Sequence, residues 1–88
     1  MKQRSRHAEA QLEESIVSLF HDLPTLCGFT VQAHGAISLT DVGFWPQPPL
    51  EDAKLIFEEI HDALTELVEE RPEARALLSG RTFARAVH

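Results

Sequence analysis

The sequence predicts a two-layer α+β fold in the order helix, β-hairpin, helix and short helix. Three features predict it: two long segments with apolar residues at helical spacing, an alternating apolar and polar segment between them, and prolines and glycines at the junctions. A chain of 88 residues can bury one thin core, and its ordinary apolar and charged contents argue against disorder. We therefore expect one domain over residues 1–88, with residues 1–5 and 81–88 as candidate flexible tails.

The first helix is expected to begin near Ser5, which can cap it, and to end at Asp22–Leu23, because Pro24 follows. Val17 and Phe20 lie beside its apolar stripe and make that stripe wider than one-sided packing requires. This helix is therefore expected either to lie between two layers or to meet another subunit. The stripe itself consists of Ala8, Leu12, Ile16, Leu19 and Leu23.

Residues 27–41 are predicted to form the hairpin, because apolar and polar residues alternate along residues 29–39. A three-residue loop places Gly35 at the left-handed position of a common hairpin turn. In this register Val31 faces Ile37, and apolar residues pair with apolar residues throughout. A two-residue loop would mix the two faces and is rejected.

Three prolines within residues 46–49 interrupt the strand pattern, and Pro49 suits the first turn of a second helix. This helix is expected over residues 50–70, with apolar residues on one side and acidic residues on the other. Leu55 falls in the middle of the acidic side, where the core pattern does not account for it. The dipeptide Arg71–Pro72 ends the helix.

A short third helix is expected over residues 73–79, with Pro72 before it and Gly80 as its stop. Residues 81–87 fit either a helix or a strand by their spacing. We expect helix or irregular structure there, because alanine and arginine are poor strand formers.

Two isolated strands are only marginally stable, so the predicted hairpin needs a partner for its open edges. Those edges include few of the lysines and prolines that protect edge strands. The simplest arrangement is a twofold homodimer in which two hairpins join into a four-stranded antiparallel sheet. The alternative is a third strand supplied by residues 81–87 of the same chain.

The net charge of −6 hides a strong segregation along the chain. Residues 7–70 carry thirteen acidic side chains and a single lysine, Lys54, whereas both ends are basic. The basic ends can fold back onto the acidic middle or pair with it in another subunit. An acidic surface disfavours nucleic acid as the main partner. A nucleic-acid contact would have to use the arginines of the two ends, Arg4, Arg6, Arg81 and Arg85.

No apolar run is long enough to span a membrane, and none follows the basic start as in a signal peptide. We therefore expect a cytoplasmic protein without a membrane partner. Cys27 is the only cysteine, which excludes an internal disulfide and a four-cysteine zinc site. It is expected to be a buried packing residue.

Glu58 and His61 stand one helical turn apart, a spacing that can place a carboxylate and an imidazole on one metal ion. With His21 they define an alternative in which the protein binds a metal or acts as a small catalyst. The spacing occurs only once, so a solvated or hydrogen-bonded histidine is the simpler interpretation. No phosphate-binding glycine loop is present in the sequence. We assign no catalytic residue, expect no cofactor, and favour a non-enzymatic protein.

The best candidate binding segment comprises Phe44, Trp45 and Pro46 with the prolines after them. A proline-stiffened chain loses little entropy on docking, and an aromatic ring offers contact area. Alternatively, Phe44 and Trp45 close the core between the hairpin and the second helix. The acidic side of the second helix is a second candidate surface, with Leu55, Glu59 and Asp62 as its residues. We therefore expect a small non-enzymatic module that binds another protein or a peptide and acts as a homodimer.

Overall fold

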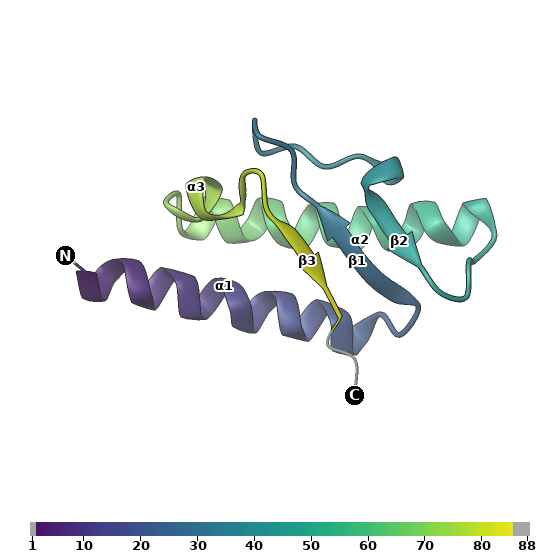
Figure 1. Cartoon of the computed structure of the whole chain (residues 1–88), viewed down its shortest axis with the longest axis horizontal. Coiled ribbons are helices and arrows are strands. Elements are labelled where there is room, and N and C mark those ends of the chain that lie inside the picture. The colour runs from purple at the N-terminus through teal and green to yellow at the C-terminus, as the bar shows by residue number, and fades with distance from the viewer. Residues whose placement is uncertain (1, 86–88) are drawn as a thin grey trace.

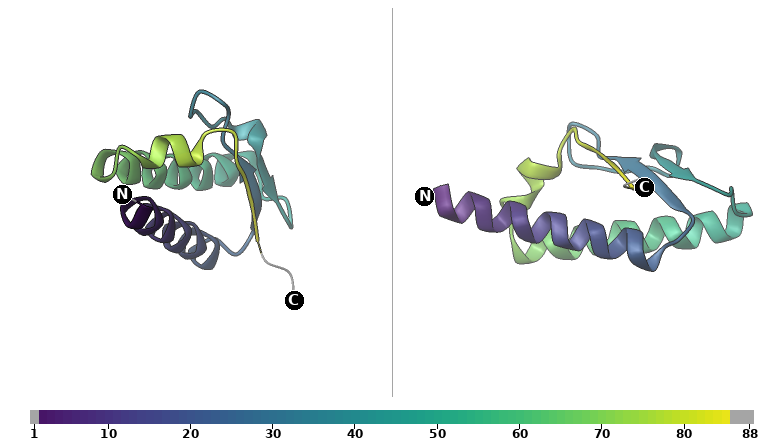
Figure 2. Two further views of the ribbon diagram at one scale, coloured as in Figure 1. Left: turned by 60° about the vertical axis from the view of Figure 1, so that its left-hand side comes forward. Right: turned by 60° about the horizontal axis from the view of Figure 1, so that its bottom comes forward.

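The chain folds into a layer of helices against one face of a three-stranded antiparallel sheet, as Figure 1 shows. The computed structural model describes the backbone of residues 2–85 and the side chains of residues 9–85. Figure 2 shows that the helices lie on one side of the sheet and that the described chain leaves the other face uncovered. The predicted α+β class is confirmed. In chain order the elements are α1 (Lys2–Asp22), β1 (Leu26–Thr30), the 3₁₀ helix η1 (Leu39–Asp41), β2 (Val42–Phe44), α2 (Leu50–Glu70), α3 (Ala74–Leu78) and β3 (Thr82–Ala84).

The helices follow the sequence pattern closely. α1 ends at Asp22 as predicted, although it begins at Lys2, ahead of the expected cap at Ser5. α2 occupies the predicted residues, and α3 lies within the range predicted for it. Gly80 follows α3 with a φ of +75°, a left-handed conformation that glycine adopts at little cost, so the predicted stop is confirmed.

β1 is the central strand, with β2 on one edge and β3 on the other, both antiparallel to it. Phe29 of β1 stands opposite Val42 of β2 and opposite Phe83 of β3. All three side chains belong to the apolar core or pack against it, so this row faces the helices.

The predicted hairpin is wrong in its second arm. Its turn does form, with Gly35 at a φ of +90° and the Gln32 N–H donating to the Ala36 carbonyl oxygen at 2.8 Å. Residues 36–38 then leave the ladder without forming a strand, and the strand that pairs with β1 is β2. The expected pairing of residues 29–31 with residues 37–39 is therefore absent from the described sheet.

Local hydrogen bonds explain this departure. The Asp41 carboxylate accepts hydrogen bonds from the Ser38 N–H at 3.1 Å, from the Ser38 hydroxyl at 2.9 Å and from the Gln32 side chain at 3.0 Å. These bonds hold η1 where the alternating pattern predicted a strand. The hydrogen bond from Gln32, followed by those from Ser38, lowers the pKa of the Asp41 carboxyl below its usual value. The charged form of Asp41 therefore stabilises the connection between β1 and β2.

The expectation of helix or irregular structure for residues 81–87 is wrong at residues 82–84, which form β3. The hydroxyl oxygens of Thr30 and Thr82 lie 3.0 Å apart across the two strands, and the Val31 N–H donates to the carbonyl oxygen of Arg81 at 2.8 Å. The chain itself thus covers an edge of β1 that we expected a second subunit to cover. A sheet joined across a dimer would contain three strands from each chain, so the four-stranded count does not fit this fold.

Phe29 lies at the centre of the core. Its ring centroid is 6.0 Å from that of Phe20 in α1 and 5.3 Å from that of Phe83 in β3. The three rings join the first helix, the central strand and the last strand. Within the described residues every buried side chain is apolar. The core cluster consists of Leu12, Ile16, Phe20, Leu23, Leu26, Phe29, Val31, Ile60, Leu64, Leu67, Ala74, Leu78 and Phe83.

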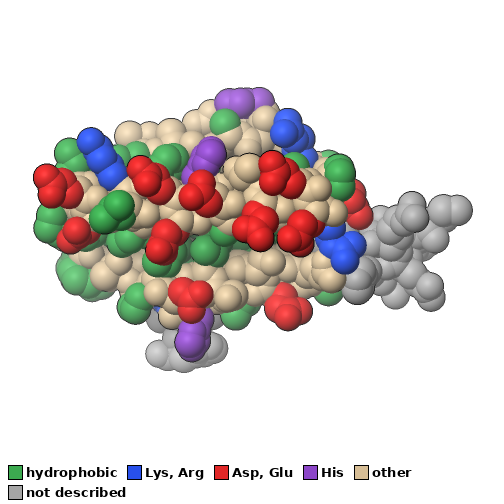
Figure 3. Space-filling model, turned by 180° about the vertical axis from the view of Figure 1, so that it is seen from behind, with side chains coloured by type: hydrophobic (Ala, Val, Ile, Leu, Met, Phe, Trp, Pro, Cys, Tyr) green, Lys and Arg blue, Asp and Glu red, His purple; other side chains and the backbone are tan. Residues whose placement is uncertain are grey.

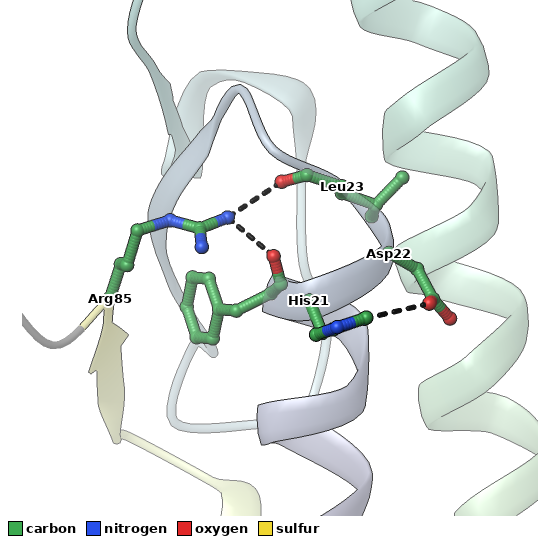
Figure 4. Close-up of polar contacts among 5 residues, drawn as sticks. His21, Asp22, Leu23 and Arg85 are labelled. Carbon is green, nitrogen blue, oxygen red and sulfur yellow. Dashed lines mark hydrogen bonds and ion pairs between the residues drawn. The ribbon is translucent and has the colours of Figure 1, made fainter.

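Arg85 ties the end of the sheet to the end of α1, as Figure 4 shows. Its guanidinium group donates to the carbonyl oxygens of Phe20, Leu23 and Leu26. The Phe20 carbonyl belongs to the last turn of α1, where helical partners are lacking and a positive charge is favoured. The guanidinium carbon also lies 5.4 Å from the centroid of the Phe20 ring. A side chain from the far end of the sequence therefore caps the first helix.

A glycine is required at position 28 of β1, because β3 passes too close for a side chain. A Cβ atom at Gly28 would lie 2.6 Å from the carbonyl oxygen of Phe83. We expect Gly28→Ala to lower the free energy of unfolding by about 1–3 kcal/mol, as overpacking does. Gly43→Ala is the matched control, because its Cβ would meet its nearest neighbour, the Gly28 carbonyl oxygen, at 3.8 Å. Urea denaturation measures the difference, and equal stabilities would contradict the register of β1 against β3.

Arg85→Met should remove the hydrogen bonds to α1 and β1 while it keeps an apolar side chain over Phe20. Because hydrogen bonds from a charged donor are lost, we expect the free energy of unfolding to fall by about 1.5–3 kcal/mol. Arg75→Met on α3 is the control, since Arg75 is exposed and should change stability by less than about 0.5 kcal/mol. Thermal and urea denaturation compare the two. A loss no larger than that of the control would show that Arg85 does not hold the end of α1.

Candidate protein-binding surface

Trp45 lies directly after β2 with its side chain in solvent. Its backbone is held in place, because the Trp45 N–H donates to the Thr25 carbonyl oxygen at 2.8 Å. The Trp45–Pro46 peptide bond is cis. The indole is 78% exposed, whereas Phe44 is half-buried and Pro46 is exposed. Trp45 therefore does not close the core, and its ring is available to a partner.

The outer face of α2 carries the second set of predicted residues. Leu55 is 62% exposed, and Glu59 and Asp62 are exposed beside it. Their spacing of four and three residues places them on one face of the helix. Leu50, at the start of α2, is also 62% exposed, so large apolar side chains reach solvent at three positions from Trp45 to Leu55.

An acidic row runs along α2, and core packing does not require it. Glu58, Asp62, Glu66 and Glu70 follow one another at a spacing of four residues, and all four are exposed. Like charges at this spacing destabilise a helix by about 0.2–0.5 kcal/mol per pair. The last turn of α2 contains no basic residue, although the C-terminal end of a helix favours cations. Figure 3 shows acidic side chains gathered over the face behind the sheet, with hydrophobic side chains between them.

Cations of the chain do not neutralise this face within the described residues. The ion pairs found there join His21 to Asp22 at 3.6 Å and His61 to Asp62 at 3.7 Å, and neither involves a lysine or an arginine. Apart from His61 beside Asp62, the acidic row is therefore without a basic partner in the part of the chain that the structure describes.

Arg81 and Arg85, near the C-terminal end, make contacts inside the fold. Arg81 lies over the Phe83 ring, 4.8 Å from its centroid, and Arg85 donates to backbone carbonyl oxygens. The side chains of Arg4 and Arg6 lie outside the described residues. The two described arginines of the predicted nucleic-acid contact thus stabilise the end of the sheet.

A groove of about 520 Å³ lies between α1 and α2. Its floor contains the apolar residues Leu19, Ala63 and Leu67, and the half-buried polar residues Gln11 and Ser15 continue it along α1. Its rims are exposed and acidic, and no lysine or arginine of the described chain lines it. The lining residues are Gln11, Glu14, Ser15, Ser18, Leu19 and Asp22 from α1, and Ala63, Glu66, Leu67 and Glu70 from α2.

The sequence interpretation missed this groove. The available signal was a pair of polar rows, each at a spacing of four residues beside an apolar stripe. Glu14, Ser18 and Asp22 form the first row, and Glu66 and Glu70 form the second. Only the packing of α1 against α2 shows that these rows face one another across Leu19 and Leu67.

A smaller pocket of about 260 Å³ separates α2 from the turn around Gly35 and from α3. Its apolar lining includes Ile37 and Leu78, and its polar lining includes both Glu69 and Arg75. Because charges of both signs line it, no single ligand charge is favoured.

The structure does not assemble a metal site from His21, Glu58 and His61. His21 lies at the end of α1 with its side chain 86% exposed, and Figure 4 shows it beside Asp22. Glu58 is exposed on α2, and the ring centroid of His61 lies 6.1 Å from that of Phe57. Among the residues that the structure describes, no three His, Cys, Asp or Glu side chains group closely enough to hold a metal ion.

Cys27 is exposed, so the expectation of a buried packing cysteine is wrong. The register of β1 against β2 shifts between Leu26 and Gly28, which interrupts the alternation of side chains along the strand. Leu26 and Phe29 therefore both face the core, while Cys27 between them is turned to solvent.

In the described part of the chain, no helix combines the length and the apolar character needed to cross a membrane. Comparison of the chain with protein-family models, with curated proteins and with solved structures finds no match. Function is therefore inferred from the geometry of the chain itself.

Proposed function

We propose that the chain is a small non-enzymatic module that binds another protein or a peptide. The observation that carries this proposal is the exposure of Trp45, Leu50 and Leu55 beside a closed apolar core. Tryptophan is enriched among the residues that contribute most to binding, and a chain stiffened by prolines loses little entropy on docking. Glu59 and Asp62, next to Leu55, would orient a partner by charge.

A cytoplasmic location is part of the same proposal. Cys27 is a free thiol that stands exposed on the surface. Free thiols persist in reducing compartments, where disulfides are rare. This exposure supports the location that the sequence led us to expect.

Trp45→Ala should weaken partner binding strongly without unfolding the chain, because its ring is exposed. Truncation of a central interface aromatic typically costs about 2 kcal/mol or more, which corresponds to about a thirtyfold loss of affinity. We would compare the proteins retained by immobilised wild-type, Trp45→Ala and Leu55→Ala chains from an extract of the expressing cells by quantitative mass spectrometry. Trp45 is the only tryptophan, so a blue shift of its fluorescence would report its burial by a retained protein once that protein is purified.

Val17→Ala is the matched control, because Val17 is 67% exposed but lies on α1. The same proteins should be retained by the wild type and by this control, and lost from Trp45→Ala and Leu55→Ala. Circular dichroism must show that all variants are folded. Unchanged profiles for both folded variants would refute the proposed surface.

We further propose that the chain acts as a homodimer through the outer edge of β3. The Val31 N–H donates to the Arg81 carbonyl oxygen, and the Arg85 N–H donates to the Cys27 carbonyl oxygen, each at 2.8 Å. In an antiparallel ladder this places the backbone groups of Thr82 and Ala84 on the side away from β1. Such an edge is a template for strand pairing, and twofold pairing is the commonest symmetry.

Ala84→Pro should convert this dimer to a monomer, because proline removes an outward N–H and leaves the ladder with β1 intact. Ala84→Thr keeps the N–H and is the control. Sedimentation equilibrium at micromolar concentration should give twice the 9.9 kDa chain mass for the wild type and the control, and the single-chain mass for Ala84→Pro. A wild type of single-chain mass would exclude the dimer.

A further inference from the structure

We infer that the groove between α1 and α2 receives a basic amphipathic helix of the partner protein. The inference rests on the proposed function and deepens it, because it names the class of partner. The occupant is a helical segment of another protein, with an apolar stripe flanked by lysines and arginines.

The shape of the groove fits a helix. Along α1 it extends from Gln11 to Asp22, which is about 16 Å at 1.5 Å per residue, or three helical turns. Leu19, Ala63 and Leu67 form an apolar patch on its floor between two polar rims, and Gln11 and Ser15 extend that floor as half-buried polar residues. Amphipathic helices bind in such grooves by placing their apolar face on the floor.

The negative charge of the groove favours lysines and arginines on either side of the apolar stripe of the bound helix. Both rims are acidic, with Glu14 and Asp22 on α1 and Glu66 and Glu70 on α2. Since no lysine or arginine of the described chain lines the groove, cations beside the apolar stripe of an incoming helix would face carboxylates on both sides. An acidic or neutral helix would lack this complementarity.

The C-terminal ends of α1 and α2 border the groove, and they differ in the groups that satisfy their free carbonyl oxygens and their negative partial charge. The end of α1 is capped by the guanidinium group of Arg85. The end of α2 receives a backbone hydrogen bond from Arg71 to Leu67, but its last turn holds acidic residues and no basic one. Arg71, the C-cap residue, is a cation at this end but does not line the groove, so the carboxylates of Glu66 and Glu70 beside Leu67 remain available to a basic helix.

Other ligands match fewer of these features. A metal ion would need three grouped ligands, and the described residues provide no such group. A free polyamine would satisfy the acidic rims but leave the apolar floor uncovered. The test therefore separates an amphipathic helix from simple attraction between opposite charges.

The probe is a fluorescently labelled peptide of about 15 residues, long enough to form a helix on docking, made of leucine and lysine at amphipathic spacing. A scrambled peptide of the same composition is its control. Fluorescence anisotropy with the wild-type chain should show binding of the amphipathic peptide that is at least about tenfold tighter than binding of the scrambled one.

Two pairs of variants locate the site. Ala63→Lys places a long cationic side chain on the floor and should weaken binding at least about tenfold, whereas Ala76→Lys adds the same charge at an exposed position of α3 and should not. The double variant Glu14→Gln with Glu66→Gln removes one carboxylate from each rim. It should weaken peptide binding about fivefold and make the affinity less dependent on salt concentration. The double variant Glu13→Gln with Glu51→Gln makes the same change of charge on the same helices, outside both the groove and the acidic row, and should leave binding unchanged.

Equal affinity for the amphipathic and scrambled peptides would overturn the inference, and so would equal losses in the groove variants and their controls. Circular dichroism checks the fold of each variant. The outcome is distinguishable from failure of the proposed function. If the peptide does not bind while Trp45→Ala loses its protein partners, the groove inference fails and the binding module stands. If Trp45→Ala and Leu55→Ala retain every partner, the proposed surface fails whatever the peptide does.

Discussion

The pairing of β3 with β1 is the contact on which the rest of the structure depends. It joins residues 52 apart in sequence, as the Thr30–Thr82 contact shows, so most of the chain must be brought together before the sheet exists. Without β3, the strands β1 and β2 would form a ribbon that is marginal in water. With β3 in place, Phe83 enters the core beside Phe29, and Arg85 reaches the end of α1. One short strand thus completes the sheet and fixes a helix terminus.

The sequence predicted the elements that local chemistry determines. Prolines and glycines mark the ends of α2 and α3, and the turn at Gly35 needed only its left-handed conformation. The second arm of the hairpin failed because Asp41 binds Gln32 and Ser38, a local network that outweighs strand alternation. β3 could not be predicted from its own residues, because pairing with distant β1 overrides the weak strand propensity of alanine and arginine.

In the candidate site, too, some features follow from local sequence, and others depend on how distant segments pack. The exposure of Leu55 on the acidic side of α2 follows from helical periodicity alone. The exposure of Trp45 depends on where the chain goes after β2, and the sequence left both interpretations open. The groove was harder to predict than either of these exposed side chains, because each helix supplies only half of its lining. Glu14 and Glu66 become opposite rims only when α1 and α2 pack side by side.

Charge has two distinct uses in this chain. Arg81 and Arg85 lie over aromatic rings, and Arg85 also donates to the carbonyl oxygens at the end of α1, so both stabilise the fold. The carboxylates of the acidic row on α2 do the opposite, because their repulsion at four-residue spacing opposes a fold that has little stability to spare. Solubility alone would be served equally by acids scattered over the surface. The acidic row instead reaches the groove beside the apolar residue Leu67, an arrangement that suits a cationic partner. Binding of such a partner would reduce the repulsion between the carboxylates of the row.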